Sequence, residues 1–100
     1  MNHQVYKVDR SKAGQIPQVT QDEIVSRLSI VTKESEVLKV PGDCIYVLLE
    51  GNDTGLARAK ELFEDQNIGR LVPPEVADQV RKAIKEEEES AAEGMGTLFG

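Results

Sequence analysis

The stretch that decides the fold runs from Cys44 to Val72 and reads CIYVLLEG, NDTG, LARAKELF, EDQN and IGRLV. The first segment is apolar at every position from Ile45 to Leu49, as in a strand that is covered on both faces or lies at the centre of a sheet. The third segment repeats its apolar residues at helical spacing, and the last is a short apolar strand that ends before two prolines. The stretch therefore predicts a central strand, a helix and a second strand.

The junction between this strand and this helix concentrates polar residues. Gly51 ends the strand, and Asn52 or Asp53 is expected to cap the helix by accepting hydrogen bonds from backbone N–H groups. Glu50, Asn52, Asp53 and Thr54 also form a candidate ligand or ion corner, because oxygen ligands suit a hard cation. The spacing does not match an EF-hand loop, so capping is the simpler interpretation. The start of the helix would also suit an anion, although the Asp53 carboxylate opposes one.

The first 28 residues predict a short helix that follows an edge strand and a loop. Residues 3–8 have a short alternating pattern compatible with an edge strand. The sequence from Thr20 to Glu23 fits a capping box, in which a hydroxyl and a carboxylate reciprocally satisfy backbone donors. It predicts a two-turn helix whose apolar face is formed by Ile24, Val25 and Leu28.

Residues 29–40 are rich in β-branched side chains, which favour extended structure. Glu34 and Ser35 are interpreted either as a turn between two strands or as a bulge in one long strand. Pro41 and Gly42 suit the centre of a tight turn, because proline fixes φ and glycine accepts a positive φ. This turn is expected to join residue 40 to the central strand as an antiparallel hairpin.

The C-terminal quarter predicts a helix that changes character along its length. Pro74 suits a first helical turn, where its missing N–H donor costs nothing. The apolar stripe that follows stops at Ile84, and residues 86–89 are four glutamates. We therefore expect one small domain over residues 1–84 and an acidic helix extension with a flexible tail over residues 85–100.

Composition limits the class of protein. The chain has 100 residues, 39% of them hydrophobic, and a net charge of −6, so one small core is expected. Residues 1–84 hold 11 Lys and Arg against 13 Asp and Glu, whereas residues 85–100 hold one Lys and five Glu. An acidic tail disfavours non-specific binding of nucleic acid. With no long apolar run and no apolar signal segment, the chain is expected to be cytoplasmic. Its single cysteine, Cys44, is expected to be a buried structural thiol.

The order strand, helix, strand, strand, helix, strand, with an added C-terminal helix, is the split βαβ pattern of ferredoxin-like folds. A reduced three-stranded variant without the first strand, or a domain completed by a partner chain, are the alternatives. Residues 46–53, followed by Ala57, Ala59, Leu62 and Ile68, resemble the second half of ACT and NIL domains, which are small ferredoxin-like regulatory modules. This resemblance implies binding of amino acids or similar small-molecule effectors and pairing of sheets or edges in a homodimer.

A second resemblance concerns the end of the chain. The glutamates at 86–89 and the terminal GMGTLFG resemble the C-terminal tail of archaeal ribosomal stalk proteins. The resemblance implies a flexible lure whose apolar residues, here Met95, Leu98 and Phe99, dock on translation factors. Glycines and repelling glutamates with a few apolar residues are also the physical pattern of a short partner motif. An inert tail, or a segment that packs back on its own domain, are the alternatives.

The sequence offers few groups for catalysis. His3 is the only histidine, which excludes a His-based triad and a two-His metal site within one chain. The glycine patterns of phosphate-binding loops are absent. We therefore expect no enzymatic activity and no cofactor. The expected function is that of a small binding or regulatory module, with two alternatives: an adaptor that uses the tail for a translation-related protein partner, and a weak RNA-binding module that uses Lys7, Arg10 and Lys12.

Overall fold

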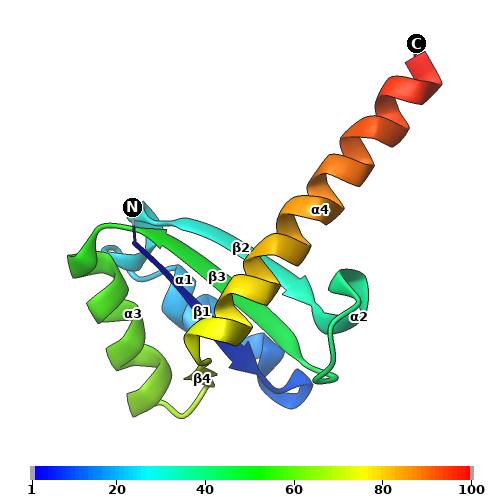
Figure 1. The fold of residues 1–100 in the computed structure, drawn as a ribbon. Helices are drawn as coiled ribbons and strands as arrows, with labels where there is room; N and C mark the ends of the chain where they lie inside the picture. The colour runs from blue at the N-terminus through cyan, green and yellow to red at the C-terminus, as the bar shows by residue number, and fades with distance from the viewer. Residues whose placement is uncertain (1, 100) are drawn as a thin grey trace.

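The computed structural model describes the backbone of residues 2–99 and the side chains of residues 2–89. Within that range four strands form one antiparallel sheet in the order β2-β3-β1-β4 (Figure 1). The strands are β1 (Asn2–Val8), β2 (Ser29–Glu34), β3 (Ile45–Gly51) and β4 (Gly69–Leu71). The helices are α1 (Ile16–Thr20), α2 (Ser35–Leu38), α3 (Asp53–Asp65) and α4 (Pro74–Phe99), with two 3₁₀ helices, η1 (Arg10–Gln15) and η2 (Val25–Arg27). The chain is an α+β domain, as predicted.

β3 is the central strand that the sequence predicts. It pairs with β1 on one side, where Val5 lies opposite Leu48, and with β2 on the other, where Val31 lies opposite the same residue. The prediction that residues 3–8 form an edge strand is wrong, because β4 pairs with the far side of β1. β1 therefore lies inside the sheet, and three of its side chains, those of Val5, Tyr6 and Val8, are fully buried.

The two faces of the sheet carry different helices. α1, η2 and α3 pack on one face, where the rings of Tyr6 and Phe63 stack with their centroids 4.2 Å apart. α4 crosses the opposite face, with α2 beside it (Figure 1). The apolar residues of α4 that are buried against the sheet are Ala77, Val80 and Ile84. The domain is therefore three layers thick, with helices on both sides of the sheet.

The segment between β1 and β2 differs from the helix that the capping box predicts. α1 ends at Thr20 instead of beginning there. The carboxylate of Asp22 accepts hydrogen bonds from the backbone N–H groups of Ile24 and Val25, at 3.0 and 3.3 Å, and only the single turn of η2 follows. The physical reason is competition: a carboxylate two residues beyond the hydroxyl satisfies the backbone donors of a turn. Val25 and Leu28 are buried as expected, whereas Ile24 is exposed.

Residues 35–44 form a helical turn and a loop where the sequence predicts a strand and a tight hairpin. α2 occupies the first four positions and ends at Lys39, which has the left-handed φ of 58°. The hairpin strand therefore stops at Glu34. The buried hydroxyl of Ser35 accepts a hydrogen bond of 3.0 Å from the N–H of Cys44, and the Ser35 N–H donates one of 2.8 Å to the Cys44 carbonyl. This pair of bonds closes the loop over the buried thiol.

α4 begins at Pro74, as predicted, and its backbone continues beyond the edge of the sheet to Phe99 (Figure 1). The predicted boundary between residues 84 and 85 falls inside this one helix, and a flexible tail is not confirmed. The side chains of Met95, Leu98 and Phe99 lie outside the described residues, so the partner motif stays a prediction. In the described part of the chain, no helix combines the length and the apolar character needed to cross a membrane.

Candidate functional site: the groove beside helix α4

A groove of about 660 Å³ lies where α4 crosses β2 and β3. Its apolar floor consists of Val31 from β2, Leu48 from β3 and Ile84 from α4. Its rim is polar and carries both signs of charge: Ser29, Glu50, Asp78, Arg81, Lys82, Lys85 and Glu88. We name this site the α4 groove. An apolar floor with a small number of convergent polar groups is typical of small-molecule sites.

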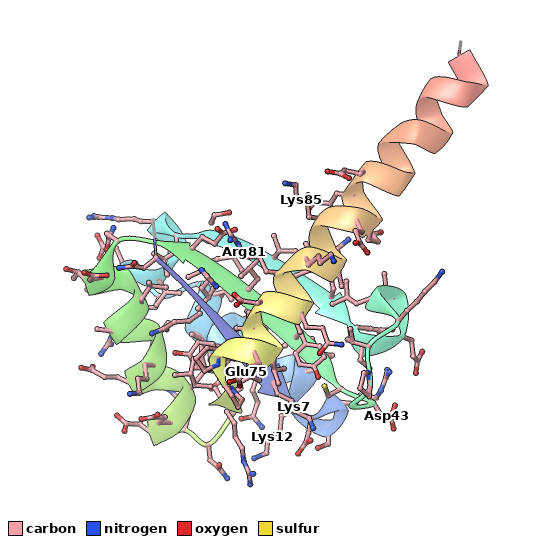
Figure 2. The ribbon with its side chains drawn as sticks, viewed as in Figure 1. Lys7, Lys12, Asp43, Glu75, Arg81 and Lys85 are labelled. Atoms are coloured by element: carbon pink, nitrogen blue, oxygen red, sulfur yellow. The ribbon has the colours of Figure 1, made fainter. Side chains whose placement is uncertain are left out.

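The residues of the groove come together because of the two-residue repeat of the strands and the three-to-four-residue repeat of the helix. On the sheet, Val31 lies opposite Leu48 and Ser29 lies opposite Glu50, so these four residues share the face that α4 covers. On the helix, side chains three, four and seven positions apart share one face. Counted from Arg81, the groove residues of α4 with that spacing are Ile84, Lys85 and Glu88. Figure 2 shows Arg81 and Lys85 on the part of α4 that crosses β2 and β3.

Two ion pairs and one histidine contact connect α4 to the sheet. Within the groove, Arg81 Nη2 lies 3.2 Å from Glu50 Oε2. The other ion pair joins Lys33 to Glu87, at 3.1 Å, and His3 Nε2 lies 3.6 Å from Asp78 Oδ1 in a contact that is ionic only when the imidazole is protonated. Considering only residues 2–89, the rim residues Lys82, Lys85 and Glu88 form no ion pair. The rim therefore keeps two cations and one carboxylate whose charges are not neutralised by the described side chains.

The structure divides the predicted ligand corner among several roles. Glu50 alone lies on the rim of the α4 groove. Asn52 caps α3, and its side-chain oxygen accepts a hydrogen bond of 2.7 Å from a backbone N–H, which confirms the capping prediction. Asp53 accepts a hydrogen bond from the Asn2 side chain, and Thr54 is exposed in the first turn of α3. Within the described part of the chain, no three His, Cys, Asp or Glu side chains gather closely enough to hold a metal ion.

The three basic residues near the N-terminus do not form one cluster. The guanidinium of Arg10 lies against three carboxylates, those of Glu34, Glu36 and Asp43, at 3.9, 2.6 and 3.0 Å. The hydrogen bond that it donates to Asp43, together with these charges, raises the pKa of Arg10 above its usual value. Lys7 and Lys12 instead line a second hollow, which also includes Arg70.

Sequence reasoning missed Arg70 and the three cations of α4. The α4 residues could have been found from the sequence, because three cations lie close together beside the apolar stripe and just before the run of glutamates. These cations are Arg81, Lys82 and Lys85. Arg70 offers no local signal, because only the pairing of β4 with β1 brings it beside Lys7. No protein-family model, curated protein or solved structure matches the chain. The functions of the α4 groove and of the second hollow are therefore inferred from the residues that line them.

Proposed function

We propose that the protein is a non-enzymatic regulatory module that binds a small zwitterionic effector of the amino-acid class in the α4 groove. The observation that carries this proposal is the combination, in one groove, of an apolar floor and a rim with both signs of charge. An amino acid with an aliphatic side chain presents the complementary groups: a carboxylate, an ammonium and an apolar surface. The resemblance of residues 46–68 to ACT and NIL domains points to the same class of ligand.

The chain topology supports a ferredoxin-like module. β1 and β2 run parallel with β3 between them, and β3 and β4 run parallel with β1 between them, because every neighbouring pair is antiparallel. Helical segments connect each of these parallel pairs. Both connections have the form expected of a split βαβ unit, which supports the proposed ferredoxin-like module. α4 is then an addition that covers the remaining face of the sheet and creates the groove.

The charges of the rim suggest how the ligand would lie. Its carboxylate would bind between Lys82 and Lys85, since neither ammonium is paired with a carboxylate of residues 2–89. Its ammonium would bind Glu88, which is likewise unpaired within that range. Its side chain would then contact Leu48 and Ile84 on the floor. Charge-assisted hydrogen bonds of this kind are stronger than neutral ones and would fix the orientation of the ligand.

The test is a titration of the ¹⁵N-labelled protein with a panel of amino acids, followed by amide NMR shifts. We expect saturable shifts at the groove for aliphatic amino acids and weaker binding of acidic ones. Lys85→Gln should weaken binding about tenfold, because one charge-assisted contact is lost. The matched control is Lys60→Gln on α3, which removes the same charge away from the groove and should bind normally. Equal weakening in both variants, or no saturable shift with any amino acid, would contradict the proposal.

A second candidate function is that of an adaptor, and the length of α4 favours it. Glu87 is the last described residue of α4 that forms an ion pair with the sheet, and the helix backbone then leaves the domain (Figure 1). A motif at Met95, Leu98 and Phe99 would thus be carried away from the body of the protein. Deleting residues 90–100 should abolish binding to a purified translation factor and leave amino-acid binding unchanged. Unchanged factor binding after the deletion would rule the adaptor out.

RNA binding has less support. That hypothesis needs Lys7, Arg10 and Lys12 together beside an accessible sheet face. Arg10 is engaged by three carboxylates, and helices cover both faces of the sheet.

A further inference from the structure

The second hollow has a volume of about 280 Å³ and lies where β4 pairs with β1, near the end of α3. Its lining consists of Lys7, Asp9, Lys12, Asn67, Ile68, Gly69 and Arg70. We name it the β1–β4 hollow. Three cations and one carboxylate make it locally positive in a chain whose net charge is −6. It is separate from the α4 groove and shares no residue with it.

Two of the cations are direct neighbours across the sheet. Lys7 and Arg70 are partners in the β1–β4 register, which places their Cβ atoms about 5 Å apart on one face. Like charges in directly opposed positions destabilise a sheet. Among residues 2–89, neither side chain forms an ion pair. An anion bound between them would remove this repulsion. Because the two cations cost stability when no anion is bound, their placement is more easily explained by ligand binding than by a contribution to the stability of the fold.

The third cation is held in place by the main chain. Lys12 Nζ donates a hydrogen bond to the backbone carbonyl of Asn67, which follows α3 and has a left-handed φ of 51°. A lysine ammonium carries three donors, so this contact leaves two for a ligand. Figure 2 shows Lys7 and Lys12 together near the start of α4, and both line the hollow. This hydrogen bond holds the ammonium of Lys12 in the hollow that Lys7 and Arg70 also line.

We propose that the β1–β4 hollow binds the phosphoryl group of a small, water-soluble molecule. A phosphate monoester carries a charge of about −1.5 to −2 at pH 7 and three strong acceptor oxygens, which suit three nearby cationic donors. The Arg70 guanidinium can engage two oxygens at once, and the two lysines act as point charges. The Asp9 carboxylate also lines the hollow and can accept a hydrogen bond from a hydroxyl of the ligand. The negative net charge of the protein disfavours long nucleic acids.

The test is an NMR titration of the full chain with inorganic phosphate at constant ionic strength, with chloride and acetate titrations in parallel. Saturable shifts at Lys7 and residues 67–70, with phosphate only, are expected. The double variant Lys7→Gln/Arg70→Gln should bind phosphate at least about tenfold more weakly, since two charge-assisted contacts are lost. The control Arg27→Gln/Lys60→Gln removes the same two kinds of charge elsewhere and should bind phosphate normally.

Three results would decide whether the hollow binds a phosphoryl group of a small molecule. Equal weakening in the control, or the same shifts with chloride, would mean general charge screening and would overturn the proposal. Tighter binding of an RNA oligonucleotide than of a phosphorylated sugar would overturn the assignment to a small molecule. Thermal unfolding gives an independent readout: without phosphate at low salt the double variant should melt at a higher temperature than the natural chain, and phosphate should raise the melting temperature of the natural chain only.

Discussion

The two faces of the sheet are covered in different ways: one is packed with buried apolar side chains, and the other combines apolar contacts with ion pairs and a groove. On the α3 face, the stacked rings of Tyr6 and Phe63 are fully buried. The α4 face has three buried apolar residues of the helix, two partly exposed ion pairs and an open groove. Burying a large apolar side chain contributes about 1.5–3 kcal/mol, whereas an exposed ion pair contributes about 0–1 kcal/mol. The α3 face should therefore hold the fold together, and the α4 face can bind ligands.

Phe63→Ala should have the largest effect on this comparison. Removing a fully buried ring that stacks on Tyr6 leaves a cavity and should lower the free energy of unfolding by about 3–5 kcal/mol. On the other face, Ile84→Val removes one methyl group and should cost about 0.5–1.5 kcal/mol. Urea denaturation measures both. If Ile84→Val cost as much as Phe63→Ala, the contrast between the two faces would be lost.

Gly55→Ala tests how closely the elements of the α3 face pack. Alanine favours a helix over glycine by about 1 kcal/mol, yet a Cβ at position 55 would lie 2.6 Å from Cδ2 and 2.9 Å from Cγ of the buried Leu28. We expect a net loss of about 1–2 kcal/mol, because overpacking outweighs the helical preference. In a Leu28→Ala background the same substitution should stabilise the protein. Stabilisation in both backgrounds, measured by urea denaturation, would show that Leu28 moves aside easily.

The sequence was most informative where structure is local. The strand and helix around Asn52 follow from an apolar run, a glycine and a cap, all within a few residues of one another. The place of residues 3–8 in the sheet could not be read in the same way. Gln4 and Lys7 make that strand look half-exposed, and only the arrival of β4, some 60 residues later, makes it central. Its burial is a product of tertiary pairing.

The same limit applies to the candidate sites. Glu50 was recognised as a site residue from its position at the end of a strand, but its partner Arg81 comes from a helix 31 residues further along. Lys7 and Arg70 are still further apart in sequence and meet only through strand register. Local sequence patterns do not predict contacts between residues that are so far apart in the chain. The crossing of α4 over the sheet and the pairing of β4 create both hollows.

Tyr46→Phe probes the α4 face through its pH dependence. The Tyr46 hydroxyl donates a hydrogen bond of 2.9 Å to the Pro41 carbonyl, and its loss should cost about 1 kcal/mol at pH 7. Burial, aided by the hydrogen bond with Cys44, raises the pKa of Tyr46 to about 12, above the value of about 10 expected for an unfolded chain. The raised pKa favours the protonated folded state, so its contribution is complete below about pH 10 and is lost as the pH rises towards 12.

The stability difference between the natural chain and Tyr46→Phe should therefore shrink between about pH 10 and pH 12. Urea denaturation at pH 8, 10 and 11 measures it. Both proteins keep the buried Tyr6, whose pKa is also raised by burial, so its titration cancels in the comparison. A difference that stays constant across this range would mean that the Tyr46 hydroxyl ionises as easily in the folded protein as in the unfolded one.

The ion pair between Lys33 and Glu87 should give the smallest effect. A double-mutant cycle with Lys33→Gln and Glu87→Gln should yield a coupling of about 0.2–1 kcal/mol, because both side chains are partly exposed, at 29% and 30%. The coupling should fall at 1 M salt, where the Debye length of about 3 Å is close to the distance between the two charged groups. The wider and more exposed pair of Glu23 and Arg27, at 3.9 Å, is the matched control and should show less coupling at any salt concentration. A salt-independent coupling above about 2 kcal/mol, well beyond the range of exposed pairs, would mean that α4 is clamped to the sheet. A weak, screened coupling would instead let the helix adjust its distance from β2 as a ligand enters the groove.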